Sequence, residues 1–305
     1  MAGLRGFSCG VSRGRGNREC WFIWGPGLAV SLASRRRLRQ GCRGNKRAHL
    51  YSRKTSGVSC IRPSVSTAVR LLDMRIRKDS YYAVVTGDIV GSSQLSLGRR
   101  ANLPRIILRG SNELRSRFPG LIPTDVEIFR GDSWQFVVSQ PSRSLRASLF
   151  FRAFLRSQFK HRDIDTRIAI GIGNIWFIPK GQPAVGDGEA FRLSGLALDK
   201  MGRSRRMAFG APANLARLDV ETVNVLLQLI DVLAKGWTDR QAYAVCGKLL
   251  DWSQVKISTQ WFRRSASQQA VAQHLDRAGW NAIHAALVLF ERSAREYDRP
   301  ASVKT

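Results

Sequence analysis

The order of strand-like and helix-like segments between residues 81 and 209 constrains the fold of this chain most. Apolar runs of strand length alternate with longer amphipathic runs that have the 3.6-residue spacing of helices. Strands are expected at 81–90, 126–130, 134–138 and 166–173, and helices at 101–118 and 142–159. The order β-α-β-β-α-β predicts an α+β fold with the split βαβ arrangement of ferredoxin-like domains. A helix at 188–201 and an edge strand at 206–209 are expected to follow.

The C-terminal part has only helical patterns. Helices are expected at 220–234, 239–250, 253–262, 268–278 and 281–295. A four-residue turn from Arg263 to Ala266 separates the third of these helices from the fourth, and Ser267 is placed to cap the fourth. The stretch 257–280 therefore resembles a helix-turn-helix, and the sequence predicts two domains, a sheet domain at 74–215 and a helical domain at 220–298.

Residues 1–73 have a different composition from the rest. They contain 15 Arg or Lys residues against only Glu19 and Asp73, and they have no period of 2 or 3.6. Met74 lies a few residues before the first expected strand, so the preferred interpretation is that residues 1–73 are a disordered basic extension outside the native protein. A disordered tail of the working protein and a targeting peptide remain alternatives.

Two acids follow the first strands of the expected sheet. Asp88 lies near the end of the first strand, and Asp132 lies in the turn between the second and third. In a split βαβ sheet these two strands are neighbours, so both carboxylates would meet at one edge. Paired carboxylates are suited to Mg²⁺ and to the metal of a bound nucleotide. The alternative is that Asp132 only satisfies the backbone of its turn.

Four segments in order carry a resemblance to a known family. They are 87–92 (GDIVGS), 130–133 (RGDS), 167–173 (RIAIGIG) and 188–191 (GEAF). Together they resemble the SatD-like family of bacterial proteins and the core of class III nucleotide cyclases. The resemblance implies that Asp88, Asp132 and the main chain of Ile89 hold Mg²⁺ or Mn²⁺. It further implies that Gly91, Ser92 and Arg192 contact a nucleotide.

The departures from the cyclases concern catalysis. Where active cyclases carry an Asn and, four residues later, an Arg, this chain has Arg192 and Leu196, and it has Ile128 in place of a purine-selecting Lys. Leu196 cannot offset the charge that develops in phosphoryl transfer. The sequence therefore favours metal and phosphate binding without a full catalytic set.

The expected helix at 268–278 has the features of a DNA-recognition helix. Val271 and Leu275 would face inward. The residues expected to contact DNA are Arg263, Arg264, Ser267, Gln268, Gln269, Gln273, His274 and Arg277. Amides and Arg suit base edges in the major groove, and arginines beside the turn suit phosphates. The formal net charge of +28 also favours an anionic partner. A helical dimerisation module with a solvated polar face is the alternative.

These observations lead to one preferred function. The chain is expected to be a cytoplasmic, DNA-binding regulator that responds to a nucleotide or to a metal, with DNA as partner, no membrane and a possible homodimer. An active metal-dependent nucleotidyl cyclase or transferase and a non-catalytic protein-interaction module are the alternatives. Cys246 is expected to be a buried, inert thiol.

Overall fold

The computed structural model describes residues 76–298 apart from 78, 130, 160–163, 180–184, 203, 216 and 262–265. All of these residues belong to one compact unit, which spans residues 67–305. The expectations for residues 1–73 lie outside the described residues. None of the helices in the described part is long and apolar enough to cross a membrane.

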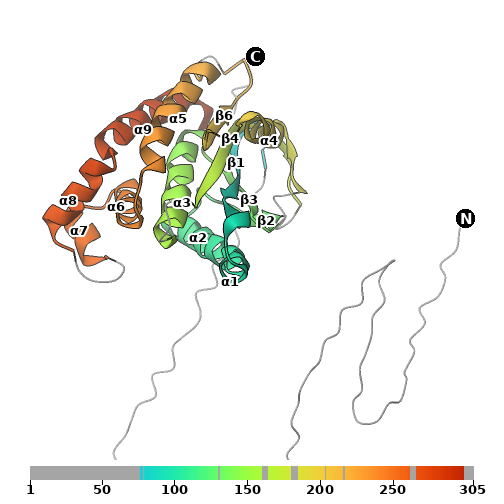
Figure 1. The fold of residues 1–305 in the computed structure, drawn as a ribbon. Coiled ribbons are helices and arrows are strands. Elements are labelled where there is room, and N and C mark those ends of the chain that lie inside the picture. The colour runs from blue at the N-terminus through green and yellow to red at the C-terminus, as the bar shows by residue number, and fades with distance from the viewer. Residues whose placement is uncertain are drawn as a thin grey trace, which may run out of the picture. The chain divides into compact units, whose positions relative to one another are not determined.

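The fold is a mixed α+β structure, as the sequence predicts (Figure 1). The strands are β1 (Tyr81–Val90), β2 (Glu127–Phe129), β3 (Ser133–Val138), β4 (Asp165–Phe177), β5 (Asp187–Gly188) and β6 (Met207–Gly210). The first helices are α1 (Leu97–Ala101), α2 (Leu103–Arg117), α3 (Ser144–Gln158) and α4 (Glu189–Lys200). The C-terminal helices are α5 (Val220–Lys235), α6 (Asp239–Leu249), α7 (Gln254–Thr259), α8 (Gln268–Arg277) and α9 (Trp280–Ala294).

One expected helix is shorter than predicted. The helix expected at 253–262 ends at Thr259, where Gln260 is its C-cap. The Trp261 ring packs edge-on against Tyr243 and stacks on His274, so the chain leaves the helical path to place it there. Gln260 and Trp261 therefore lie after α7 and not inside it, and residues 262–265 lie outside the described residues.

The sheet is mostly antiparallel, with β1 at its centre. The strand order is β2-β3-β1-β4-β5, and β6 pairs in parallel with β4. Because side chains alternate along a strand, β1 directs Ala83 and Val85 into the main core and Val84 toward the opposite face. Figure 1 shows α3 and α4 on opposite sides of the sheet. A Cβ on Gly171 of β4 would lie 2.3 Å from the Ala190 carbonyl oxygen, so this glycine lets α4 approach closely.

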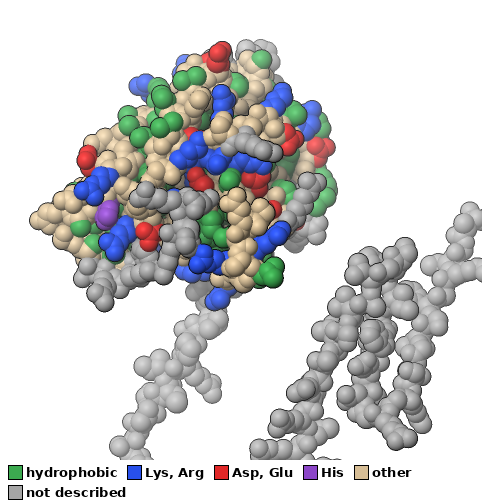
Figure 2. Space-filling view, viewed as in Figure 1, with side chains coloured by type: hydrophobic (Ala, Val, Ile, Leu, Met, Phe, Trp, Pro, Cys, Tyr) green, Lys and Arg blue, Asp and Glu red, His purple; other side chains and the backbone are tan. Residues whose placement is uncertain are grey.

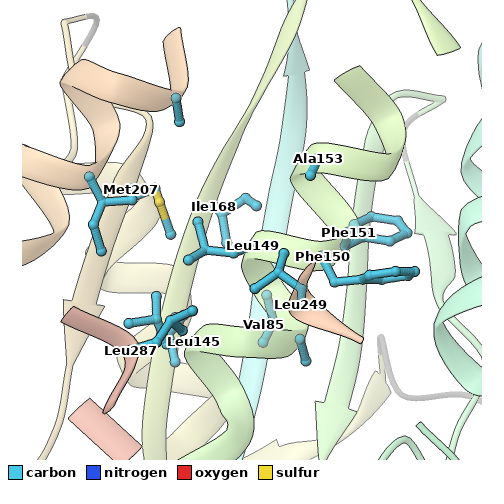
Figure 3. Close-up of a cluster of buried hydrophobic side chains, with 14 of the residues drawn as sticks. Val85, Leu145, Leu149, Phe150, Phe151, Ala153, Ile168, Met207, Leu249 and Leu287 are labelled. Atoms are coloured by element: carbon cyan, nitrogen blue, oxygen red, sulfur yellow. The ribbon is translucent and has the colours of Figure 1, made fainter. Parts of the chain in front are cut away.

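The C-terminal helices share the core of the sheet. Figure 3 shows Leu145 and Leu149 of α3 in a cluster with Ile168 of β4 and with Leu249 and Leu287 of the C-terminal helices. All of these side chains are buried in one hydrophobic cluster. The predicted division into 74–215 and 220–298 therefore falls inside a continuous core.

Three buried arginines of α3 also tie these parts together. Arg146 donates to Glu291 of α9 at 2.6 Å, and Arg156 donates to the Trp237 carbonyl at 2.9 Å. Arg152 donates to Asp165 of β4 at 2.5 and 3.0 Å and to Asp231 of α5 at 2.9 Å. Burial alone would lower the pKa of the Arg152 guanidinium, but the two carboxylates outweigh it and raise that pKa. Arg152 is therefore held charged in the core, where one cation joins the sheet to α5.

We expect Arg152→Met to destabilise the protein by about 3–5 kcal/mol, because it leaves Asp165 without its cation and leaves the buried Asp231 with only the partly exposed Lys235. Urea unfolding followed by circular dichroism measures this loss. Arg115→Met is the control, since the side chains of Arg115 and Asp125 are 22% and 58% exposed and such pairs contribute about 1 kcal/mol or less. Equal losses in the two variants would contradict the role of the buried network.

Candidate functional site

The first predicted acid, Asp88, is paired with an arginine. Asp88 lies opposite Arg167 of β4 and opposite Ser133 of β3 in the sheet register. The Arg167 guanidinium donates to both carboxylate oxygens, with Nε to Oδ1 at 2.9 Å and Nη2 in closer contact with Oδ2. The hydrogen bonds to Asp88 raise the pKa of Arg167, against the effect of its partial burial, and the charges of Asp88 and Asp199 add to the rise.

The second predicted acid, Asp132, lies at the same edge. It directly precedes Ser133, which is the cross-strand partner of Asp88. Ser92 Oγ donates to Asp132 Oδ2 at 2.6 Å, and the Ile89 N–H donates to the Asp132 carbonyl at 3.2 Å. Gly91 adopts a positive φ of 76°, which turns the chain after β1 so that Ser92 faces this acid. The structure thus brings Asp88, Ile89, Ser92 and Asp132 together, as the sequence predicts.

The carboxylates at this edge do not fit a cation site in their present arrangement, because other side chains already bind their oxygens. Both oxygens of Asp88 are held by Arg167, and one oxygen of Asp132 is held by Ser92. Within the described part of the chain, no group of three or more His, Cys, Asp or Glu side chains could hold a metal ion. Arg167 supplies the positive charge that a cation would otherwise supply to Asp88. Arg167 begins the segment RIAIGIG at 167–173, but its spacing from Asp88 in the sequence does not indicate this pairing.

The structure does not bring Arg192 to this edge. The Arg192 guanidinium lies over the Trp176 ring, 5.0 Å from its centroid. Trp176 follows Arg167 along β4 by nine residues, which is roughly 30 Å of strand. Arg192 therefore lies near the opposite end of β4 from Asp88, and the predicted nucleotide contact of Arg192 does not join that of Gly91 and Ser92.

A buried polar cluster lies between these two ends and was not predicted. Thr86 Oγ1 donates to Gln135 Oε1 at 2.9 Å and lies 3.0 Å from Ser194 Oγ of α4. All three side chains are buried, with Ser194 fully so. The cluster fixes α4 over β1 and β3, and its residues gave no sequence signal because an isolated Ser or Thr is common in strands and helices.

The predicted recognition helix has one buried side and one polar side. Val271 and Leu275 of α8 are buried. The Ser267 hydroxyl accepts from the Ala270 N–H at 3.1 Å and so caps the helix. The exposed residues include Gln268, Gln269, Gln273 and Arg277. Arg263 and Arg264 lie outside the described residues. Helices α6 and α7 pack against the buried side of α8, and Figure 2 shows basic side chains next to a histidine at this end of the molecule.

His274 differs from the other predicted DNA contacts. Its ring stacks on Trp261 with 5.7 Å between centroids and 16° between planes. Burial lowers the pKa of His274, and the charges of Arg240 and Arg277 lower it further. His274 therefore favours its neutral form more than an ordinary histidine does, and it contributes a partly covered ring stacked on Trp261 to this surface.

We expect an NMR titration to place the pKa of His274 below the ordinary 6.5. Trp261→Ala should raise that pKa, because it removes the ring that covers His274. Since the pKa is lowered in the folded state, protonation opposes folding, and the contribution of His274 to stability falls as the pH drops through about 6.5. A pKa at or above 6.5, unchanged by Trp261→Ala, would contradict the stacking.

The structure therefore presents two separate candidate surfaces. One is the sheet edge with Asp88, Arg167, Asp132 and Ser92. The other is the polar side of α8. No family model matches this chain, and no curated protein matches it.

Proposed function

We propose that this protein is a DNA-binding regulator of the SatD-like type that reads duplex DNA with α8. The observation that carries the proposal is the division of α8 into two sides. Val271 and Leu275 anchor the helix in the core, whereas Gln268, Gln269, Gln273 and Arg277 face solvent. Amides on an exposed helix read adenine edges in the major groove, and an Arg beside them contacts guanine or a phosphate.

We further propose that the sheet is a ferredoxin-like, cyclase-like domain that binds rather than turns over its ligand. The strand order β2-β3-β1-β4 with α2 and α3 packed against one face supports the proposed topology. The pairing of Asp88 with Arg167 and the exposed Leu196 support binding without turnover. The same pairing disfavours the alternative of an active cyclase.

Ion pairs link the sheet edge to α5, and helix packing continues from there to α8. Arg167 holds Asp88, and two residues earlier on β4, Asp165 holds Arg152. Arg152 also pairs with Asp231 of α5, and the next helix, α6, packs on α8. A ligand that draws Arg167 away from Asp88 would therefore act on the strand that is joined to the C-terminal helices.

We expect two kinds of substitution on α8 to weaken DNA binding differently. Gln273→Ala should cost about 1–3 kcal/mol on a specific site and little on random duplex, because it removes a base contact. Arg277 is the last residue of α8, and we assign it to a phosphate, so Arg277→Ala should weaken binding to all duplexes alike and reduce the salt slope by about 1. Selection of bound duplexes followed by titrations at several salt concentrations measures both effects.

Arg105→Ala is the matched control for charge, since Arg105 is exposed on α2. It should leave specific binding unchanged. If no duplex is selected and the wild-type protein binds none at low salt, α8 is a packing helix and the regulator proposal fails.

Cation binding at the sheet edge is a second proposal, and Arg167 makes it testable. Arg167→Gln would leave Asp88 unpaired beside Asp132, and the two like charges would be relieved by a divalent cation. We therefore expect Mg²⁺ or Mn²⁺ to raise the melting temperature of Arg167→Gln more than that of the wild type. Asp132→Asn in the same background should remove the gain. An unchanged response in all three proteins would exclude the site.

A further inference from the structure

Helix α5 exposes an apolar stripe on the side that faces away from the core. Val223, Leu227 and Ile230 are buried, whereas Val225, Leu229 and Val232 are 54%, 62% and 67% exposed. The three exposed residues are separated by four and then three positions, which is the spacing of a coiled-coil seam. A monomer has no use for such a row of large exposed side chains, whose burial would be favourable.

The charges beside the stripe match a second copy of the same helix. Glu221, Gln228 and Lys235 recur every seven residues and therefore lie along one edge of the seam. Glu221 and Lys235 are equally far from Gln228. When two copies of α5 lie antiparallel about a two-fold axis near Gln228, each Glu221 comes close to Lys235 of the partner subunit. Lys235 remains 38% exposed while it also pairs with Asp231.

Helix α5 also differs from the rest of the chain in its charge. The chain carries a formal net charge of +28, and two copies would repel across most surfaces. Helix α5 has two acids, Glu221 and Asp231, and Lys235 is its single basic residue. This helix therefore lets two copies approach with little repulsion. Its neighbour α9 adds Val288 and Leu289, which are 46% and 43% exposed, and Figure 2 shows hydrophobic side chains exposed over this region.

We propose that the protein forms a two-fold homodimer in which the α5 stripes of two copies pack antiparallel. Val225, Leu229 and Val232 form the seam, and Glu221 and Lys235 set its direction. The inference does not depend on DNA binding, because it rests on the exposed seam and the self-complementary charges alone.

Sedimentation of the full chain over a range of concentrations tests the dimer. The wild type should pass from monomer to dimer, and Leu229→Glu should weaken dimerisation by about tenfold or more because it places two buried acids near the axis. Leu108→Glu is the matched control, since Leu108 is 51% exposed on α2. It should leave the dimer unchanged. Circular dichroism and melting temperature show that both variants remain folded.

A crosslink tests the direction of packing. Gln228→Cys should form an intermolecular disulfide between the two copies of position 228, identified by mass spectrometry of the linked peptides, because this position lies near the axis. Glu221→Lys should weaken the dimer at low salt and have less effect at high salt. A wild type that stays monomeric, a dimer that Leu229→Glu leaves intact, or the absence of the linked peptide would each overturn the proposal.

Discussion

The charged contacts of Arg152 hold together the parts of this structure that the chain order separates. Arg152 comes from α3, Asp165 from β4 and Asp231 from α5, and the three meet where water is excluded. A buried guanidinium without carboxylates would be very costly, so the sheet and α5 must come together for α3 to be buried at all. Arg146 forms a further ion pair with Glu291 of α9, and the Ser142 hydroxyl donates a hydrogen bond to Asp298 near the C-terminal end. The helices that carry α8 are therefore attached firmly to the sheet.

An arginine also pairs with a carboxylate at the sheet edge, but there the pair is partly exposed to solvent. Asp88 and Arg167 form a bidentate pair, but their side chains are 19% and 31% exposed. Solvent lowers the cost of separating such a pair. Arg152 is locked by burial, whereas Arg167 is held mainly by Asp88 and can respond to a competing ion. This difference in burial places the more easily separated pair at the edge and the fully buried one in the core.

Much of the fold follows from the sequence, because periodicity reports burial directly. Strands β1 and β3 and helices α2 and α3 lie at the segments 81–90, 134–138, 101–118 and 142–159 that apolar spacing predicts, and Ser133 extends β3 by one residue. The meeting of Asp88 and Asp132 was also predicted, since it needs only neighbouring strands. The buried arginines of α3 could not be predicted, because arginines at these positions indicate a solvated helix face unless the distant acids are known. The pairing of Arg167 and the end of α7 likewise depend on residues far away in the chain.

The distribution of charge bears on both proposed partners, which are duplex DNA and a second copy of the chain. The chain has 50 Lys and Arg residues against 22 Asp and Glu. Several of the acids are buried in ion pairs. Asp165, Asp231 and Glu291 are buried or nearly so in pairs with α3, and Asp88 is held by Arg167. Arg146, Arg152 and Arg156 are buried with these α3 partners, so burial removes three positive and three negative charges and leaves the net basic excess unchanged. The excess of basic residues therefore attracts an anionic partner to most of the surface. The stripe on α5 is different, since Val225, Leu229 and Val232 offer apolar area with few charges. The two proposals therefore place polyanion binding and self-association on different surfaces, and neither interaction would block the other.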